Sequence, residues 1–399
     1  MQYIATTFAH GNGPYSRIID LGLAINREFS ERRLPKMRVL VPLVYGERQR
    51  RIILEQFEQV AEEEPDRLLL DETYGKLLGE IFFKTGSYEE NLRAFAEHYS
   101  GLEERVRNHL SSTFTAKTLD GRDVRVNGEH IDFEISHNPR VATGYQKSFY
   151  TTIALFSEIL ERTFGESSLK FDRDVLAETI KIAERIERDK AVHFIPEPFA
   201  FSYDGTREKR EREIFTPPFI HSPKPDTREI PKGMYVTITG IDGLRTLFDE
   251  VSKFGIQLYC PDFINLQNAD NRFSPEIISN PDILYHFART GWSSVWLSHI
   301  TETPLITPPY KEGDDPEIYF NERSVRKLGI ATLFDSEEDP KKILEEANLQ
   351  VKEMKGINRR LVDGYGTLDG IDYTARIIAD FLEGKDISSY REVLPVLAD

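Results

Sequence analysis

A glycine and two hydroxyl side chains come directly before a helical run in RTGWSSVWLSHI, at Gly291, Ser293 and Ser294. If Ser293 or Ser294 caps this helix, the first backbone N–H groups point outward and the positive end of the helix dipole stabilises an anion there. Arg289 adds a charged donor that suits a phosphate. Serine is also a favoured helix cap and glycine a favoured turn residue, so an ordinary turn explains the same pattern. The chemistry indicated is the binding of a phosphate group.

An acidic loop follows the next strand-like run. The run at 304–309 predicts a strand, and Asp314, Asp315 and Glu317 come soon after its end. Ligands of open parallel sheets bind at the carboxyl ends of the strands. Carboxylates bind phosphate poorly, but they accept hydrogen bonds well from sugar hydroxyls. The turn and the loop together predict a ligand that is part phosphate and part polyol.

A histidine lies in a glycine-rich loop near the start of the chain. His10 follows the strand-like run 2–9, and Gly11 and Gly13 come after it. Because histidine titrates near neutral pH, His10 is a candidate general base for an attacking hydroxyl. A loop histidine that only makes local hydrogen bonds is the open alternative. The loop lacks the GK[ST] ending of a Walker-type nucleotidase, which excludes that class.

A small hydroxyl residue ends a further strand-like run, where Thr239 and Gly240 follow MYVTI. This position either presents a hydroxyl to a diphosphate or is a simple strand-ending turn. Four other histidines show no spacing typical of metal ligands; they are His137, His193, His221 and His299. We therefore predict no metal ion and no other cofactor.

The elements of the first half must bring these residues to one edge of a sheet. A strand at 2–9, a glycine turn, a helix at 16–29 and a strand at 37–45 are typical of a βαβ unit with parallel pairing and a right-handed crossover. The pattern then predicts amphipathic helices over 50–115, a hairpin with a DG turn over 115–127, and further helices over 148–164 and 172–190.

The second half repeats the alternation of strands and helices. Proline and charged residues mark 195–232 as a linker, and helices at 241–254 and 293–300 alternate with strands beyond it. We infer an α/β protein with two doubly wound domains that face a cleft. The predicted parts are an N-terminal domain at 1–215 with helical and hairpin insertions, a linker at 216–232, a C-terminal domain at 233–365 and a helical tail at 366–399.

Composition excludes several classes of protein. The chain of 399 residues has a formal net charge of −16, whereas a nucleic-acid partner normally requires a basic face. No apolar run reaches the roughly 20 residues of a membrane span, and the start lacks the features of a signal peptide. The single cysteine, Cys260, supports no internal disulfide and favours the reducing cytoplasm.

Residues 281–329 resemble the donor-binding signature of GT-B glycosyltransferases, such as the UDP-glycosyltransferases and MurG-like enzymes. Gly291-Trp292-Ser293-Ser294 match the turn that binds the nucleotide diphosphate, and Glu302-Thr303-Pro304 match the start of the next strand. The run GDDPEIYFN replaces the acidic D-Q…N element. Thr290 stands where the family has a histidine, and Leu297 stands where it has a glutamate.

This resemblance implies two Rossmann-like domains around a cleft, with the C-terminal tail returning to the N-terminal domain. It places the acceptor on the N-terminal side and assigns the role of general base to His10, in the loop with Gly11 and Gly13. It also implies a set of donor-binding residues, which are Thr239, Gly240, Arg289, Gly291, Trp292, Ser293, Ser294, Asp314, Asp315 and Glu317.

The function expected from the resemblance is metal-independent transfer of a sugar from a nucleotide-diphosphate sugar, such as a UDP-sugar, to a hydroxyl acceptor. The acceptor is a small molecule, a lipid or a glycan, and peripheral contact with a membrane is compatible with this. One alternative is a nucleotide-sugar epimerase of the same fold. The other is a non-catalytic nucleotide-sugar-binding or partner subunit, which the substitutions at Thr290 and Leu297 favour.

Overall fold

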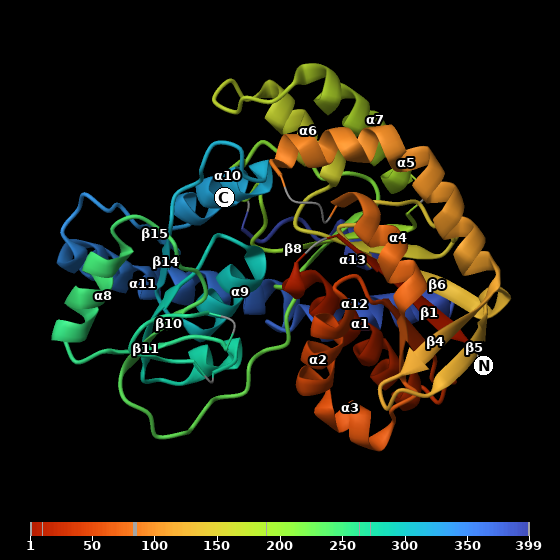
Figure 1. The fold of residues 1–399 in the computed structure, drawn as a ribbon, viewed down its shortest axis with the longest axis horizontal. Helices are drawn as coiled ribbons and strands as arrows, with labels where there is room; N and C mark the ends of the chain where they lie inside the picture. Colours follow the sequence, from red (N-terminus) through yellow and green to blue (C-terminus); the bar gives the residue numbers. More distant parts are fainter. Residues whose placement is uncertain are drawn as a thin grey trace.

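The structure is a computed structural model that describes residues 2–9, 11–82, 86–188, 190–262, 264–271 and 273–397. Two α/β domains lie side by side, with the N-terminal domain at the right of Figure 1 and the C-terminal domain at the left. Within the described ranges, no helix combines the length and the apolar character needed to cross a membrane.

The sheet of the N-terminal domain contains nine of the described strands, in the order β5-β4-β3-β2-β1-β6-β7-β8-β9. Neighbouring strands are parallel except in the pairs β3–β4 and β4–β5. The carboxyl ends of β1, β2 and β6 therefore meet at one edge. The strands are β1 (Tyr3–Phe8), β2 (Arg38–Pro42), β3 (Leu68–Asp71), β4 (Thr113–Thr118), β5 (Asp123–Asn127), β6 (Ile131–His137), β7 (Ser148–Thr151), β8 (Val192–Pro196) and β9 (Glu213–Thr216).

Helices cover both faces of this sheet because alternate residues of its strands point to opposite sides. Ile4 and Phe8 of β1 belong to one core, which includes α1 and α2, whereas Tyr3 and Ala5 belong to the other, which includes α4 to α7. The helices are α1 (Asn12–Glu31), α2 (Gly46–Gln56), α3 (Glu58–Glu63), α4 (Glu72–Phe82), α5 (Tyr88–Ser111), α6 (Phe156–Gly165) and α7 (Arg173–Arg188).

The described strands of the C-terminal domain form a fully parallel sheet in the order β12-β11-β10-β13-β14-β15. Helix α8 covers one face and α9 the other, while α11 contributes to both cores. The strands are β10 (Gly233–Val236), β11 (Gln257–Tyr259), β12 (Ala269–Asp270), β13 (Ile283–Phe287), β14 (Leu305–Thr307) and β15 (Thr332–Leu333). The helices are α8 (Leu244–Lys253), α9 (Trp292–Thr301), α10 (Pro316–Lys327) and α11 (Pro340–Tyr365).

One hydrophobic core continues from α1 of the N-terminal domain to α9 of the C-terminal domain. The indole N–H of Trp296 on α9 donates to the carbonyl of Pro198 at 2.8 Å, and the hydroxyl of Ser324 on α10 donates to the carbonyl of Ala200 at 2.7 Å. These bonds hold α9 and α10 against the loop that follows β8.

The C-terminal tail returns to the N-terminal domain, as the resemblance implied. Helix α12 (Gly370–Leu382) packs along α1, and α13 (Ser388–Glu392) contacts β9. The buried carboxylate of Glu197 accepts hydrogen bonds from the hydroxyl of Tyr365 and from the backbone N–H groups of Val396 and Leu397, at 2.9 and 3.0 Å for the two N–H groups. The expected architecture of two doubly wound domains with a returning tail is confirmed.

Three expectations about single elements are wrong. β3 lies inside the stretch 50–115, which was expected to be helical throughout, and β7 forms the start of the expected helix 148–164. β9 lies within the expected linker 195–232. Each of these strands has four residues, all buried, so it shows neither the period of two nor the length that distinguishes a strand in a sequence.

Candidate functional site

Three loops meet at the carboxyl edge of the C-terminal sheet, because β10, β13 and β14 are neighbours. Thr239 and Gly240 follow β10, the turn from Arg289 to Gly291 follows β13, and the acidic loop follows β14. The N–H of Thr237 donates to the carbonyl of Phe287 at 2.9 Å, which holds the first two loops together. Gly240 has a φ of 78°, a left-handed conformation that favours glycine. The predicted donor-binding segments therefore lie at one edge.

Helix α9 begins at Trp292, with Gly291 in extended backbone conformation as its N-cap. Neither Ser293 nor Ser294 caps the helix, so that expectation is wrong; the N–H of Ser294 instead bonds the carbonyl of Gly291 at 3.0 Å. No side chain caps the N-terminus. The first N–H groups of a helix have no partner within it, so this end offers donors and a positive dipole to an anion.

Asn321 on α10 holds this turn in place. Its amide oxygen accepts a hydrogen bond from the indole N–H of Trp292 at 2.6 Å, and its amide nitrogen donates to the carbonyl of Thr290 at 2.9 Å. Asn321 and Thr290 are fully buried, and Trp292 is nearly so. A single side chain thus determines the position of the backbone on both sides of Gly291.

The three acidic residues of the loop make different local interactions. Asp314 forms an ion pair with Arg289 at 3.4 Å, and both side chains are partly exposed. Asp315 is the N-cap of α10, where its carboxylate accepts from the N–H of Glu317 at 2.9 Å. Glu317 accepts from the amide of Asn321 at 3.3 Å. The acidic residues therefore lie beside the turn that Asn321 holds.

The pKa of Glu317 is raised to about 8. Burial and the negative charge of Asp315 raise it, and the hydrogen bond from Asn321 and the positive charge of Arg140 lower it in part. Arg140 belongs to the loop after β6, so its charge acts on Glu317 from the opposite domain. The sugar-binding role expected of Glu317 stays a prediction.

The loop after β1 approaches the turn from the N-terminal domain. A Cβ atom added at Gly13 would lie 2.7 Å from the hydroxyl of Ser293, so the first turn of α1 meets the first turn of α9. The N–H of Gly11 donates to the hydroxyl of Tyr45. His10, the expected general base, lies outside the described residues.

We expect a double-mutant cycle to detect the contact between the two helix ends. In an open helix position, Gly→Ala stabilises by about 0.5–1 kcal/mol, as Gly101→Ala should do on α5, where a Cβ meets nothing. Gly13→Ala should destabilise the wild type but not a Ser293→Ala background, with a coupling of about 1 kcal/mol in urea unfolding. Additive free energies would contradict the contact.

A second histidine, His137, lies at the carboxyl edge of the N-terminal sheet. It pairs in register with Phe8 of β1, and its ring stacks on Phe219 at 5.7 Å. Burial lowers its pKa to about 4, so the imidazole is uncharged at neutral pH. The hydroxyl of Thr151 donates to the carbonyl of Ser136 at 3.1 Å, so its oxygen accepts from Nδ1–H of His137 at 3.2 Å.

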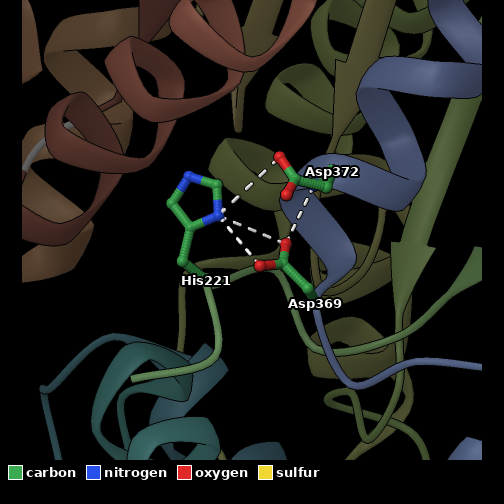
Figure 2. A group of neighbouring side chains, drawn as sticks. All are labelled: His221, Asp369 and Asp372. Atoms are coloured by element: carbon green, nitrogen blue, oxygen red, sulfur yellow. Dashed lines mark hydrogen bonds and ion pairs between the residues drawn. The ribbon is translucent and has the colours of Figure 1, made fainter. Parts of the chain in front are cut away.

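Among the described residues, one group of three side chains has the geometry for a metal ion, formed by His221, Asp369 and Asp372 (Figure 2). It joins the linker to the N-terminus of α12, away from the donor-side loops. Nη2 of Arg27 lies 2.7 Å from Oδ1 of Asp372 and 3.4 Å from Nε2 of His221. Arg27 pairs with Asp372 and His221 pairs with Asp369 at 3.0 Å, so we interpret the group as an ion-pair network.

This network predicts a pH-dependent contribution to stability. Burial alone would lower the pKa of His221, but the hydrogen bond to Asp369 and the charges of Asp369, Asp20 and Asp372 raise it. The contribution is therefore complete below the ordinary histidine pKa of about 6.5 and lost as the pH rises through the folded value. His221→Gln should cost about 0.5–1 kcal/mol in urea unfolding at pH 6, and less at pH 9. The exposed His98 is the control, and an equal cost at both pH values would contradict the network.

Sequence reasoning missed three residues of this region. Asn321 is the last residue of the acidic run GDDPEIYFN, but it was not among the predicted donor-binding residues. Arg140 and His137 were given no role. The pairing of strands β1 and β6 places His137 at the edge, and only the docking of the two domains brings Arg140 near Glu317. No local pattern carries either signal.

Several solved structures align with this chain over almost its whole length. TcCGT1 in complex with UDP aligns with a TM-score of 0.60 and 10% identity over 96% of this chain and 99% of that chain. A UDP-glucosyltransferase from Polygonum tinctorium capable of glucosylating indoxyl aligns with 0.59 and 12% over 96% and 99%. The glycotransferase of kitacinnamycin aligns with 0.57 and 12% over 96% and 98%.

These likenesses establish that the chain has the GT-B fold over 96% of its length. No family description and no curated protein matches the sequence itself.

Proposed function

We propose that this chain is a glycosyltransferase that moves a sugar from a nucleotide-diphosphate sugar to a hydroxyl of an acceptor, without a metal ion. One observation carries the proposal: the uncapped N-terminus of α9 faces the N-terminus of α1 across the two domains, at Ser293 and Gly13. Both ends carry positive dipole potential, which suits a diphosphate leaving group. The GT-B fold is shared with glycosyltransferases, which supports the same reaction.

The donor would bind on the C-terminal side. In this proposal the backbone from Gly291 to Ser294, with Arg289 and the loop Thr239–Gly240, binds the diphosphate. Asp314, Asp315 and Glu317 bind sugar hydroxyls. A UDP-sugar is the favoured donor, because similar structures include complexes with UDP and with UDP-L-rhamnose.

The acceptor would bind on the N-terminal side, where His10 acts as general base. The acceptor oxygen attacks the anomeric carbon while the bond from that carbon to the diphosphate oxygen breaks. The hydroxyl proton passes to His10, and the diphosphate leaves with its charge stabilised by the end of α9. The acceptor is a small molecule, a lipid or a glycan, and we place the reaction in the cytoplasm.

A non-catalytic nucleotide-sugar-binding subunit is the second candidate. Thr290 and Leu297 favour it because they replace a histidine and a glutamate of the donor signature, and both side chains are buried. A nucleotide-sugar epimerase is the further alternative.

Calorimetry with UDP-, TDP- and GDP-sugars, followed by product analysis with and without EDTA, tests the proposal. We expect one nucleotide class to bind, and turnover that EDTA does not change. Binding without turnover would support the non-catalytic subunit, free nucleotide released without an acceptor would support the epimerase, and no binding would exclude all three.

A further inference from the structure

An ion pair joins two loops of the candidate site. Nη2 of Arg289, in the turn after β13, lies 3.4 Å from Oδ2 of Asp314, in the loop after β14. β13 and β14 are neighbouring parallel strands, so the two loops leave the sheet at the same edge. The side chains of Arg289 and Asp314 are 46% and 29% exposed, so water reaches both charges. An ion pair at this exposure is weak, and its members can exchange partners.

The backbone on both sides of this ion pair is fixed. The hydroxyl of Tyr310 donates to the carbonyl of Asp314 at 3.3 Å. The carbonyl of Thr290, the residue after Arg289, accepts from the amide of Asn321 at 2.9 Å. These bonds use backbone atoms of the two loops. The carboxylate and the guanidinium can therefore turn toward another partner while the loops keep their shape.

The other two acids of the loop are bound within α10. Asp315 accepts from the N–H of Glu317 at 2.9 Å, and Glu317 accepts from the amide of Asn321 at 3.3 Å. The carboxylate of Asp314 pairs across the site with Arg289 instead. Asp314 is therefore the acid of this loop that acts directly on a proposed diphosphate ligand.

The two members of the ion pair are proposed to contact different parts of the donor, Arg289 the diphosphate and Asp314 a hydroxyl of the sugar. A carboxylate repels a diphosphate and competes with it for the guanidinium. When the sugar is present, its hydroxyl donates to Asp314 and replaces the lost contact with Arg289. A nucleotide without a sugar offers no such replacement, so its binding bears the full cost of separating the ion pair.

We propose that Asp314 is a specificity-determining residue of the donor site, which competes with the diphosphate for Arg289 and so favours a nucleoside-diphosphate sugar over the free nucleoside diphosphate. This inference rests on the proposed function, since it assumes that Arg289 binds a diphosphate. The same competition promotes release of the nucleotide product, because Asp314 loses its sugar partner when the sugar is transferred. One carboxylate thus serves both donor choice and product release.

Calorimetry with UDP and with UDP-glucose on the full chain measures this role directly. Asp314→Asn keeps the size of the side chain and removes its charge. UDP should bind about fivefold more tightly, the upper end of what an exposed ion pair contributes, because repulsion of the diphosphate is removed as well. UDP-glucose affinity should change by less than about twofold, because a neutral amide accepts the sugar hydroxyl less strongly than a carboxylate does. The ratio of the Kd for UDP to the Kd for UDP-glucose should therefore fall by about threefold or more.

Glu312→Gln is the matched control. Glu312 lies two positions earlier in the same loop and carries the same charge, but it pairs with Lys170 at 3.3 Å. Its loss should leave both affinities within about twofold. In an Arg289→Gln background, Asp314→Asn should raise UDP affinity no more than Glu312→Gln does, because the cation for which Asp314 competes is gone. Asp314→Ser carries the same expectation for UDP if Asp314→Asn does not fold.

UDP affinity that does not rise in Asp314→Asn or Asp314→Ser would overturn the inference and leave the proposed function standing, since UDP and UDP-glucose still bind. An equal rise in Glu312→Gln, or an undiminished rise in the Arg289→Gln background, would overturn it in the same way. If UDP and UDP-glucose both fail to bind the wild type, the experiment is repeated with the TDP and GDP pairs. Failure of all pairs would overturn the proposed function and the inference with it.

Discussion

Asn321→Ala should weaken nucleotide binding at least about tenfold, which corresponds to about 1.4 kcal/mol. The substitution removes the acceptor of the Trp292 indole N–H and the donor to the carbonyl of Thr290, and both partners are buried. Leaving buried polar groups unpaired costs about 1–3 kcal/mol for each. The turn around Gly291 should therefore lose its fixed shape, and the measurement is calorimetry with UDP.

Asn358→Ala is the matched control for this prediction. Asn358 on α11 binds His299 in the last turn of the same helix α9, where it accepts from Nδ1 at 2.9 Å and donates to the carbonyl at 2.7 Å. It is also a buried asparagine that makes two bonds to α9. Its loss should lower the free energy of unfolding by a similar amount but should leave UDP affinity within about twofold.

The comparison tests the location of the nucleotide site as well as its strength. If both asparagine variants lose the same stability and the same affinity, α9 matters only as a folded helix and its N-terminus has no special role. If only Asn321→Ala loses affinity, the nucleotide site lies at the N-terminal turn. Loss of affinity only in Asn358→Ala would move the nucleotide site to the other end of α9.

The order of elements was predictable because local patterns specify it. The βαβ unit at the start shows a buried strand, a glycine turn and a helix with an apolar stripe, and β1, α1 and β2 match those segments. The DG hairpin also appears, as β4 and β5. These features depend on residues close together in the chain, which is where sequence patterns carry information.

The short buried strands were not predictable, because they depend on residues that are far apart in the chain. β9 carries Glu213, a charged residue that is fully buried because Arg207 pairs with it at 2.6 Å. Arg207 also pairs with Glu158 of α6 at 2.8 Å. A local pattern of proline and charge therefore predicted a solvated linker, whereas a tertiary ion pair permits a core strand.

In the candidate site, too, features set by neighbouring residues were predictable and features set by tertiary contacts were not. The turn around Gly291 was identified from residue types, but the condition that Ser293 or Ser294 caps the helix is not met, because Gly291 holds that position. Serine favours the cap position only as an average, and the position itself depends on where the helix begins, which is Trp292. Arg140 lies 177 positions before Glu317 in the chain, so the effect of its charge on Glu317 depends on the docking of two domains and has no local signal.

His10→Ala should lower the rate of sugar transfer by about 10²–10⁴-fold, which is the usual contribution of a general base. UDP affinity should stay within about twofold, because the side chains proposed to bind the donor belong to the C-terminal domain and His10 is proposed to act only on the acceptor. Single-turnover measurements with donor bound separate this chemical step from binding and product release. The control is His98→Ala on the exposed face of α5, which should change neither quantity.

The basis of this prediction is the position of His10 in the chain between two described segments. Ala9 donates to the carbonyl of His137 at 3.2 Å, and Gly13 meets Ser293 at the proposed diphosphate site. A hydroxyl that attacks the anomeric carbon must release its proton on the N-terminal side of that site. Histidine is the side chain best suited to take it near neutral pH.

Added imidazole provides a readout that a structural role would not affect. If His10 accepts the proton, imidazole should restore part of the transfer rate in His10→Ala, and it should not change the wild type or His98→Ala. Full activity in His10→Ala would instead show that another group accepts the proton. His137 would then be the next residue to test, because its Nδ1 proton is committed to Thr151 and its Nε2 is therefore the basic nitrogen.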